Sequence, residues 1–167
     1  TFYPSKGKER LKSMIETRPD WCVSRQRVWG VPLPIFVHKK TKEILVDDEV
    51  IENIASIYEK EGSDCWFSDN PQRFLGTKHN ADDYEKLSDI VEVWFDSGST
   101  HSFVLEKRED LKWPASMYLE GSDQHRGWFH SSLLESCGTR GRAPFESILS
   151  HGFVVDGKGL KMSKSLG

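Results

Sequence analysis

The first apolar residues of the chain repeat at a helical spacing. Leu11, Met14 and Ile15 fall on one face of a helix, and Ser5 stands before them as a candidate N-cap. Pro19 lacks a backbone donor and ends this pattern. The sequence therefore predicts an amphipathic helix that begins after Ser5 and ends before Pro19.

The pattern between residues 18 and 88 is less regular and predicts a mixture of short elements. Residues 18–30 are rich in Trp and Arg without a clear period, which favours a loop. Residues 35–38 and 43–46 flank a polar turn and predict a small hairpin. A helix is expected to end at Gly62, and its apolar side is predicted to consist of Val50, Ile51, Ile54, Ile57 and Tyr58. Residues 63–88 are polar and irregular, which is typical of a peripheral insertion.

From residue 90 onward the apolar residues form short continuous runs, which predict buried strands. Residues 90–95 and 116–120 are two such runs. The second run is followed by a glycine turn and by a helix that is predicted to end near Gly138. The core side of this helix is predicted to consist of Phe129, Leu133 and Cys137. Further runs at 148–149 and 153–155 complete a strand–helix–strand unit, so the sequence predicts an α/β fold with a parallel sheet.

Candidate ligand-binding residues stand at the end of the predicted strand 116–120. In an open parallel sheet, ligands bind beyond the carboxyl ends of the strands and near helix N-termini. Gly121 would let a ligand approach the backbone, Asp123 could accept hydrogen bonds from ribose hydroxyls, and Glu120 could pair with a substrate ammonium group. The alternative is structural, with Asp123 as a helix cap and Glu120 in solvent.

Composition and charge narrow the class of protein. Hydrophobic residues make up 37% and charged residues 29% of the 167 residues, and 23 Lys and Arg against 26 Asp and Glu give a net charge of −3. These values are typical of one polar soluble domain, or of one domain with an insertion, and give no global footprint for nucleic acid. Pro32 and Pro34 interrupt the longest apolar stretch, and no secretory signal opens the chain, so membrane and secreted proteins are excluded.

The cysteines and the chain ends add two expectations. Cys22, Cys65 and Cys137 lie far apart without a Cys-x-x-Cys pair, which favours reduced thiols and a cytoplasmic location. The chain starts at Thr1 without a methionine, and it stops directly after a short basic loop. We therefore expect a piece of a longer protein.

That basic loop is a candidate catalytic element. Lys161 and Lys164 lie three residues apart after a glycine-rich turn. Two ammonium groups in a mobile loop can stabilise the negative charge that develops on a leaving pyrophosphate. An exposed polar loop is the alternative for a generic pentapeptide of this composition.

Residues 161–165 read KMSKS, which is the second signature of the class I aminoacyl-tRNA synthetases. Longer strings resemble the isoleucyl branch of that family: RPDWCVSRQRVWG at 18–30, EVWFDSGST at 92–100, YLEGSDQHRGWF at 118–129 and HGFVVDGKGLKMSKSLG at 151–167. The resemblance covers nearly all of the chain and weakens between about residues 41 and 88.

The resemblance implies a role for each matching position. The aminoacyl-adenylate site would comprise Glu120, Gly121, Asp123 and Gln124. Trp94 and Trp128 would form the walls of the pocket for the branched aliphatic side chain, because rigid aromatic faces can measure such a group by contact area. Core packing is the alternative for either tryptophan.

The nucleotide contacts are implied in the same way. His151, Phe153 and Val154 would border the adenine. Lys164, and secondarily Lys161, would bind ATP and stabilise the pyrophosphate during activation. The implied reaction is ATP-dependent activation of L-isoleucine, followed by transfer of the isoleucyl group to the 3′ end of tRNA(Ile).

Cofactors and domains follow from what the resemblance covers. Mg²⁺ would accompany ATP, and no residue set indicates a metal site. The zinc-binding cysteine cluster, the His-Ile-Gly-His signature, the editing domain and the anticodon-binding helices of the family are absent from this sequence. Residues 1–34 would follow the editing insertion, 35–89 would form an α+β connective insertion, and 90–167 would form the C-terminal half of a Rossmann-like nucleotide-binding domain. We expect this segment to need the remainder of the synthetase chain as a partner and to be inactive alone.

Two alternative functions remain at this point. One is a valyl-type aliphatic synthetase. The other is a non-catalytic module for tRNA or protein binding, in which residues 18–30 would recognise RNA by pairing guanidinium groups with phosphates and by stacking on bases.

Overall fold

The computed structural model describes residues 1–165 and divides the chain into two units, each described here by itself. The first unit comprises Thr1–Trp21 together with Val93–Gly167, and the second comprises Cys22–Glu92. The second unit includes more residues than the predicted insertion 35–89, and the bounds of that insertion stay a prediction. Among the described residues, no helix is both long enough and apolar enough to cross a membrane.

The first unit is built on a parallel sheet of three strands in the order β1-β7-β6. These strands are β1 (Phe2–Tyr3), β6 (Tyr118–Gly121) and β7 (Ile148–His151). Strand β7 lies between its neighbours, with Ile148 opposite both Phe2 and Tyr118. The predicted parallel sheet and α/β class are therefore confirmed.

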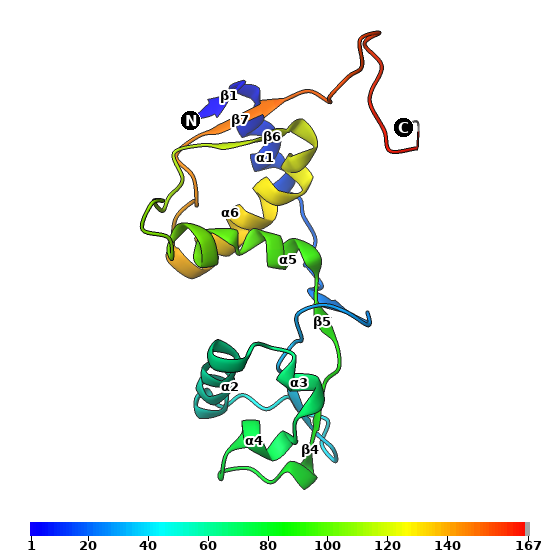
Figure 1. Ribbon diagram of the computed structural model, residues 1–167, viewed down its shortest axis with the longest axis vertical. Helices are drawn as coiled ribbons and strands as arrows, with labels where there is room; N and C mark the ends of the chain where they lie inside the picture. Colours follow the sequence, from blue (N-terminus) through cyan, green and yellow to red (C-terminus); the bar gives the residue numbers. More distant parts are fainter. Residues whose placement is uncertain (166–167) are drawn as a thin grey trace. The chain divides into compact units, whose positions relative to one another are not determined.

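Two helices and the sheet enclose the core of the first unit. Helix α1 (Lys6–Glu16) and helix α6 (Trp128–Arg140) contribute Leu11 and Phe129, which are 2% and 0% exposed (Figure 1). The complete buried cluster consists of Leu11, Tyr118, Phe129, Phe145 and Ile148. The apolar spacing that predicted the first helix thus places Leu11 in the core. The side chain of Ser5, however, makes no capping hydrogen bond, because Ser5 itself has helical backbone angles.

The predicted strand at 90–95 is wrong for most of its length. Only β5 (Ile90–Val91) is a strand, and helix α5 (Val93–Gly98) begins two residues later. The apolar side chains of α5 explain the error, because Val93, Trp94 and Phe95 are exposed rather than buried. An apolar run at a surface helix has the same sequence pattern as a buried strand. A π-helical turn, His101–Leu105, and a 3₁₀ helix, Ser122–Arg126, complete the first unit.

Helix α6 is longer than predicted. It ends at Arg140, and Gly141 adopts the left-handed conformation with a φ of 71°. Gly138 is therefore inside the helix, and Cys137 is exposed rather than on the core side. The residue that lies on the core side of this turn is Ser136, which is 0% exposed and donates a hydrogen bond to the backbone oxygen of Arg142. A buried serine has no apolar side chain to reveal its position in the sequence pattern, so the prediction placed Cys137 instead of Ser136 on the core side of α6.

Replacing Gly138 by alanine is expected to stabilise the first unit by about 0.5–1 kcal/mol, because glycine loses more backbone entropy in a helix interior. A methyl group at this position would meet no atom within 4 Å. Thermal or urea unfolding measures the gain. Gly141→Ala is the matched control and should destabilise, because its φ of 71° disfavours a side chain.

The second unit contains two small antiparallel sheets and three short helices. Its strands are β2 (Ser24–Arg25) paired with β5, and β3 (Phe36–His38) paired with β4 (Tyr84–Lys86). Its helices are α2 (Asp48–Glu61), α3 (Cys65–Ser68) and α4 (Pro71–Leu75), with a 3₁₀ turn at Ala81–Asp83. Its core consists of Phe36, Val50, Ile54, Ile57, Trp66, Phe74 and Leu75.

Helix α2 confirms the helix predicted before Gly62. Asp47 caps it by accepting a hydrogen bond from the backbone N–H of Glu49 at 3.0 Å. Lys78 and His79 contact the same carboxylate, and their hydrogen bonds hold the pKa of Asp47 well below its usual range. These contacts join residues 78 and 79 to the N-terminus of α2.

One other expectation for this unit holds and two need correction. The predicted hairpin is present, because Val37 bridges to Ile44 and the N–H groups of His38 and Leu45 donate to the carbonyl oxygens of Glu43 and Phe36, although β3 also pairs with β4. The predicted loop at 18–30 contains β2. Residues 63–88 are not a peripheral irregular segment, because Trp66 and Phe74 are 1% and 0% exposed. A few buried aromatic residues order this otherwise polar stretch.

Candidate functional site

The candidate site begins where β6 and β7 end side by side. Gly121 is opposite His151 in the register of the two strands. A methyl group added to Gly121 would lie 2.5 Å from Oδ1 of Asp123 and 3.8 Å from Cε1 of His151. The structure thus brings Glu120, Gly121, Asp123 and His151 together at one edge of the sheet, as expected for a ligand site in this kind of fold.

The polar groups at these strand ends face solvent. Glu120 and Asp123 are exposed, and Oε2 of Glu120 accepts a hydrogen bond from the N–H of Gly121 at 3.3 Å. Nδ1 of His151 lies 2.6 Å from the carbonyl oxygen of Gly152, which can only accept, so this nitrogen carries the hydrogen. In the neutral ring Nε2 is then an acceptor. The edge can therefore offer two carboxylates and one imidazole acceptor to a ligand.

The segment after β7 folds back on itself, so that part of the KMSKS loop pairs with residues 153–155. Val155 bridges to Lys161, and the N–H of Met162 donates to the carbonyl oxygen of Val154 at 3.0 Å. The ammonium group of Lys161 lies 3.7 Å from the centre of the Phe153 ring. Three of the predicted residues, Phe153, Val154 and Lys161, therefore lie together in this hairpin. Lys164 follows the bridge between Val155 and Lys161 and is exposed.

Trp128 begins helix α6 and is held by three contacts. Its backbone N–H donates to Oε1 of Gln124 at 2.8 Å, and its indole Nε1 donates to the carbonyl oxygen of Ser97 at 2.9 Å. Its ring stacks on Tyr118 with the ring centres 4.0 Å apart and the planes 8° apart. The indole is partly buried, so it contributes to packing, and its predicted role as a pocket wall stays a prediction.

Trp94 extends from α5 and is 41% exposed. A methyl group on Gly127 would lie 3.0 Å from Cη2 of its indole and 2.3 Å from Oε1 of Gln124. Trp94 and Gln124 therefore both pack against the bare backbone of Gly127. The predicted residues Gln124, Trp94 and Trp128 form a second group, at the start of α6.

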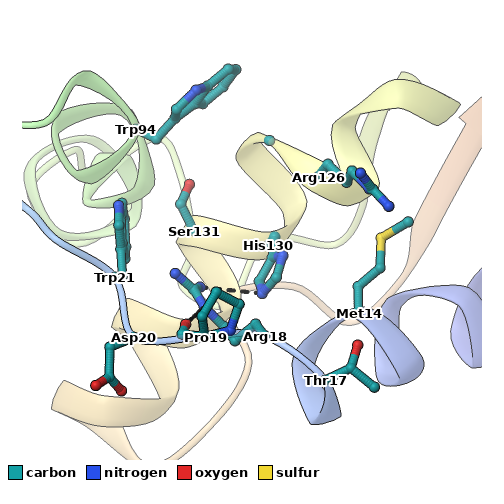
Figure 2. Close-up of a pocket in the computed structure, with 11 residues that line it drawn as sticks. Met14, Thr17, Arg18, Pro19, Asp20, Trp21, Trp94, Arg126, His130 and Ser131 are labelled. Atoms are coloured by element: carbon teal, nitrogen blue, oxygen red, sulfur yellow. Dashed lines mark hydrogen bonds between the residues drawn. The ribbon is translucent and has the colours of Figure 1, made fainter.

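A pocket of about 430 Å³ lies beside this second group (Figure 2). Trp94 contributes to its lining, together with Met14, Thr17, Arg18, Pro19, Asp20, Trp21, Arg126, Gly127, His130 and Ser131. Figure 2 shows His130 on α6 and Arg18 on the segment after α1, joined by a hydrogen bond. Sequence analysis did not select these two residues, although the density of Arg and Trp after residue 18 was a signal for them.

Arg18 and His130 set the charge of this pocket. Nη1 of Arg18 lies 3.3 Å from Nε2 of His130, and because arginine can only donate, this nitrogen accepts. Burial and the neighbouring charge of Arg18 lower the pKa of His130. The guanidinium group of Arg18 also lies over the ring of Trp21, 5.1 Å from its centre. The pocket thus combines the guanidinium groups of Arg18 and Arg126, the carboxylate of Asp20, an imidazole and aromatic faces.

Glu135 on α6 gives the first unit a dependence on pH. Burial, and secondarily the charge of Asp96, raises the pKa of Glu135 to about 8. Between about pH 5 and 8 the folded protein therefore holds a proton that the unfolded chain releases, so stability falls as pH rises. We expect the melting temperature of Glu135→Gln relative to the native protein to increase across this window. Glu9→Gln, at an exposed carboxylate of α1, should show no such trend.

Comparison of the sequence with known proteins identifies the class of protein. The chain belongs to the tRNA synthetases class I (I, L, M and V), a family that matches residues 1–167. Within this family it is 89% identical over 166 residues to the isoleucine–tRNA ligase of Pelagibacter ubique, covering 99% of this chain and 18% of that protein. The predicted resemblance to the isoleucyl branch is therefore confirmed.

A second isoleucine–tRNA ligase and one solved structure are also similar to this chain. The chain is 60% identical over 167 residues to the isoleucine–tRNA ligase of Brucella abortus strain 2308, covering 99% of this chain and 17% of that protein. The LeuRS of Agrobacterium radiobacter K84, crystallised as a ternary complex with tRNA and LeuAMS, has a similar fold, with a TM-score of 0.59 and 21% identity over 93% of this chain and 23% of that chain. The chain thus spans less than a fifth of the length of the ligases cited.

Proposed function

We propose that this chain is a segment of an isoleucine–tRNA ligase. The complete enzyme activates L-isoleucine with ATP to isoleucyl-adenylate and transfers the isoleucyl group to the 3′ end of tRNA(Ile). The observation that carries the proposal is the 89% identity to an isoleucine–tRNA ligase along nearly the whole segment. The three free cysteines agree with a reducing, cytoplasmic location.

In this proposal the edge formed by β6 and β7 holds the adenylate. The Glu120 carboxylate pairs with the ammonium group of isoleucine, and the Asp123 carboxylate accepts hydrogen bonds from the ribose. Gly121 keeps this edge open, since a methyl group there would lie 2.5 Å from the Asp123 carboxylate. His151, Phe153 and Val154, which end and follow β7, border the adenine.

The KMSKS loop acts on the phosphates in this proposal. Lys164 and Lys161 stabilise the negative charge that develops on pyrophosphate as the bond to the α-phosphate breaks. Mg²⁺ enters with ATP, and in residues 1–165 no group of three or more His, Cys, Asp or Glu side chains is placed to hold a metal ion. The segment therefore supplies lysines and strand ends, while the phosphates themselves are the ligands for the ion.

Trp94 and Trp128 select the amino acid in this proposal. Both indoles lie at the start of α6, one against Gly127 and one against Tyr118. Flat aromatic walls favour the larger isoleucine side chain over valine through the additional methylene that they contact. In this proposal, discrimination between isoleucine and valine therefore depends on the second group of residues, which consists of Gln124, Trp94 and Trp128.

Exchange of pyrophosphate into ATP, measured with a panel of amino acids on the complete reading frame that contains this segment, tests the proposal. Exchange driven by isoleucine, with valine a weaker second, is expected. Exchange driven mainly by valine would indicate the valyl alternative. A folded protein without exchange would leave the RNA-binding alternative, for which substitution of Arg18 should then weaken tRNA binding while Lys164→Ala does not.

A further inference from the structure

Tyr118 contacts the proposed isoleucine pocket without lining it. It begins strand β6, it is 3% exposed, and its ring stacks on the Trp128 indole with the ring centres 4.0 Å apart and the planes 8° apart. Nearly parallel rings at this separation are stacked face against face, and such pairs contribute beyond the area that they bury. The stack therefore fixes the plane in which the Trp128 indole lies.

The other contacts of Trp128 fix its position within that plane. The carbonyl oxygen of Ser97 on α5 accepts the indole N–H at 2.9 Å, and Oε1 of Gln124 accepts the backbone N–H at 2.8 Å. These bonds restrain the edge of the ring and the start of its helix. They do not prevent the indole from tilting about the Nε1–oxygen line. Tyr118 opposes this tilt by direct stacking, because the other ring beside the indole, Phe129, lies farther away, with the ring centres 6.3 Å apart and the planes 37° apart.

Tyr118 is itself held in place from two directions. Its hydroxyl lies 3.0 Å from Oγ of Ser132, which is 0% exposed. Its ring also packs against Phe145, with the ring centres 5.0 Å apart. A buried hydroxyl pair and an aromatic neighbour together leave this ring little freedom to move.

We propose that Tyr118 is a positioning residue for amino-acid selection, which acts by holding the Trp128 indole in the orientation that favours isoleucine over valine. The inference rests on the proposed function of the site and extends it to a residue that does not contact substrate. Contact area with a single methylene is small, so a tilted wall loses discrimination before it loses binding of the ATP moiety.

Tyr118→Met in the complete enzyme tests this inference, because methionine fills the core without a flat face. We expect the ratio of kcat/KM for isoleucine to kcat/KM for valine to fall about three- to tenfold, while the KM for ATP stays unchanged. Tyr118→Phe should restore the native ratio, because it keeps the ring and loses only the bond to Ser132. The ratio is independent of the concentration of folded enzyme, so partial unfolding does not mimic the effect. Tyr118→Leu serves as a second variant if the Tyr118→Met protein folds poorly.

Two reference variants separate the possible failures. Leu11→Ala removes a buried side chain of α1 from the same core, and it should lower the melting temperature while keeping the ratio. Trp128→Ala should lower the ratio at least as much as Tyr118→Met. An unchanged ratio in both Tyr118→Met and Tyr118→Leu, or an equal fall in Leu11→Ala, overturns the inference. Absence of isoleucine-dependent exchange in the native enzyme overturns the proposed function instead.

Discussion

Lys164→Ala in the complete enzyme is expected to lower kcat for isoleucine-dependent pyrophosphate exchange about 100- to 1,000-fold, with little change in isoleucine affinity. Lys164 is exposed and lies beyond the bridge between Val155 and Lys161. Its ammonium group is therefore free to approach a ligand from solvent. An interaction made only in the transition state changes kcat, so loss of the Lys164 ammonium group should lower kcat without weakening isoleucine binding.

The neighbouring lysines provide the comparison for this prediction. Lys161 lies over the Phe153 ring, so part of its role is to hold the loop, and Lys161→Ala should lower kcat less than Lys164→Ala does. Lys158→Ala is the matched control, because Lys158 is an exposed lysine of the same turn outside the KMSKS pentapeptide. Equal losses in kcat and in isoleucine affinity for Lys164→Ala would remove this residue from the transition-state role.

The sequence predicted two of the three strands of the parallel sheet because they depend on local signals, whereas strand β1 was not predicted. The apolar run at 116–120, followed at once by Gly121, is sufficient to indicate a strand end. His151 was proposed only from the family resemblance, and the parallel pairing of β6 and β7 places it opposite Gly121. The end of the strand was therefore foreseeable from pattern, and the histidine beside it was not.

What the sequence did not show depends on contacts between distant residues. Nothing in the pattern around Trp66 distinguishes a core tryptophan from an exposed one, and its burial depends on Phe36 and Phe74. The bond between Arg18 and His130 joins residues 112 positions apart. Helix α5 was taken for a strand because its stability depends on packing against α6 rather than on a helical period of its own.

Gly127 lies against two of the proposed site residues, Gln124 and Trp94, which gives the second large expected effect. An alanine methyl group would lie 2.3 Å from Oε1 of Gln124 and 3.0 Å from the Trp94 indole. The first distance is shorter than a methyl group tolerates, so the Gln124 amide must move, and the second is tight, so the Trp94 indole must shift by a few tenths of an ångström. The Gln124 oxygen accepts the N–H of Trp128 at 2.8 Å, so its movement breaks that bond.

We therefore expect Gly127→Ala to raise the KM for isoleucine about 100-fold while the KM for ATP changes by less than about threefold, since misplacing a positioning group by an ångström can cost this much. Gly138→Ala, within helix α6, which Gly127 precedes, is the matched control, because it adds the same methyl group where no atom lies within 4 Å, and it should leave both constants unchanged. Steady-state exchange at varied isoleucine and varied ATP measures the two constants. An equal rise in both would mean that the start of α6 supports the whole site rather than the amino-acid pocket, whereas a rise for isoleucine alone would place Gln124, Trp94 and Trp128 on one selective surface.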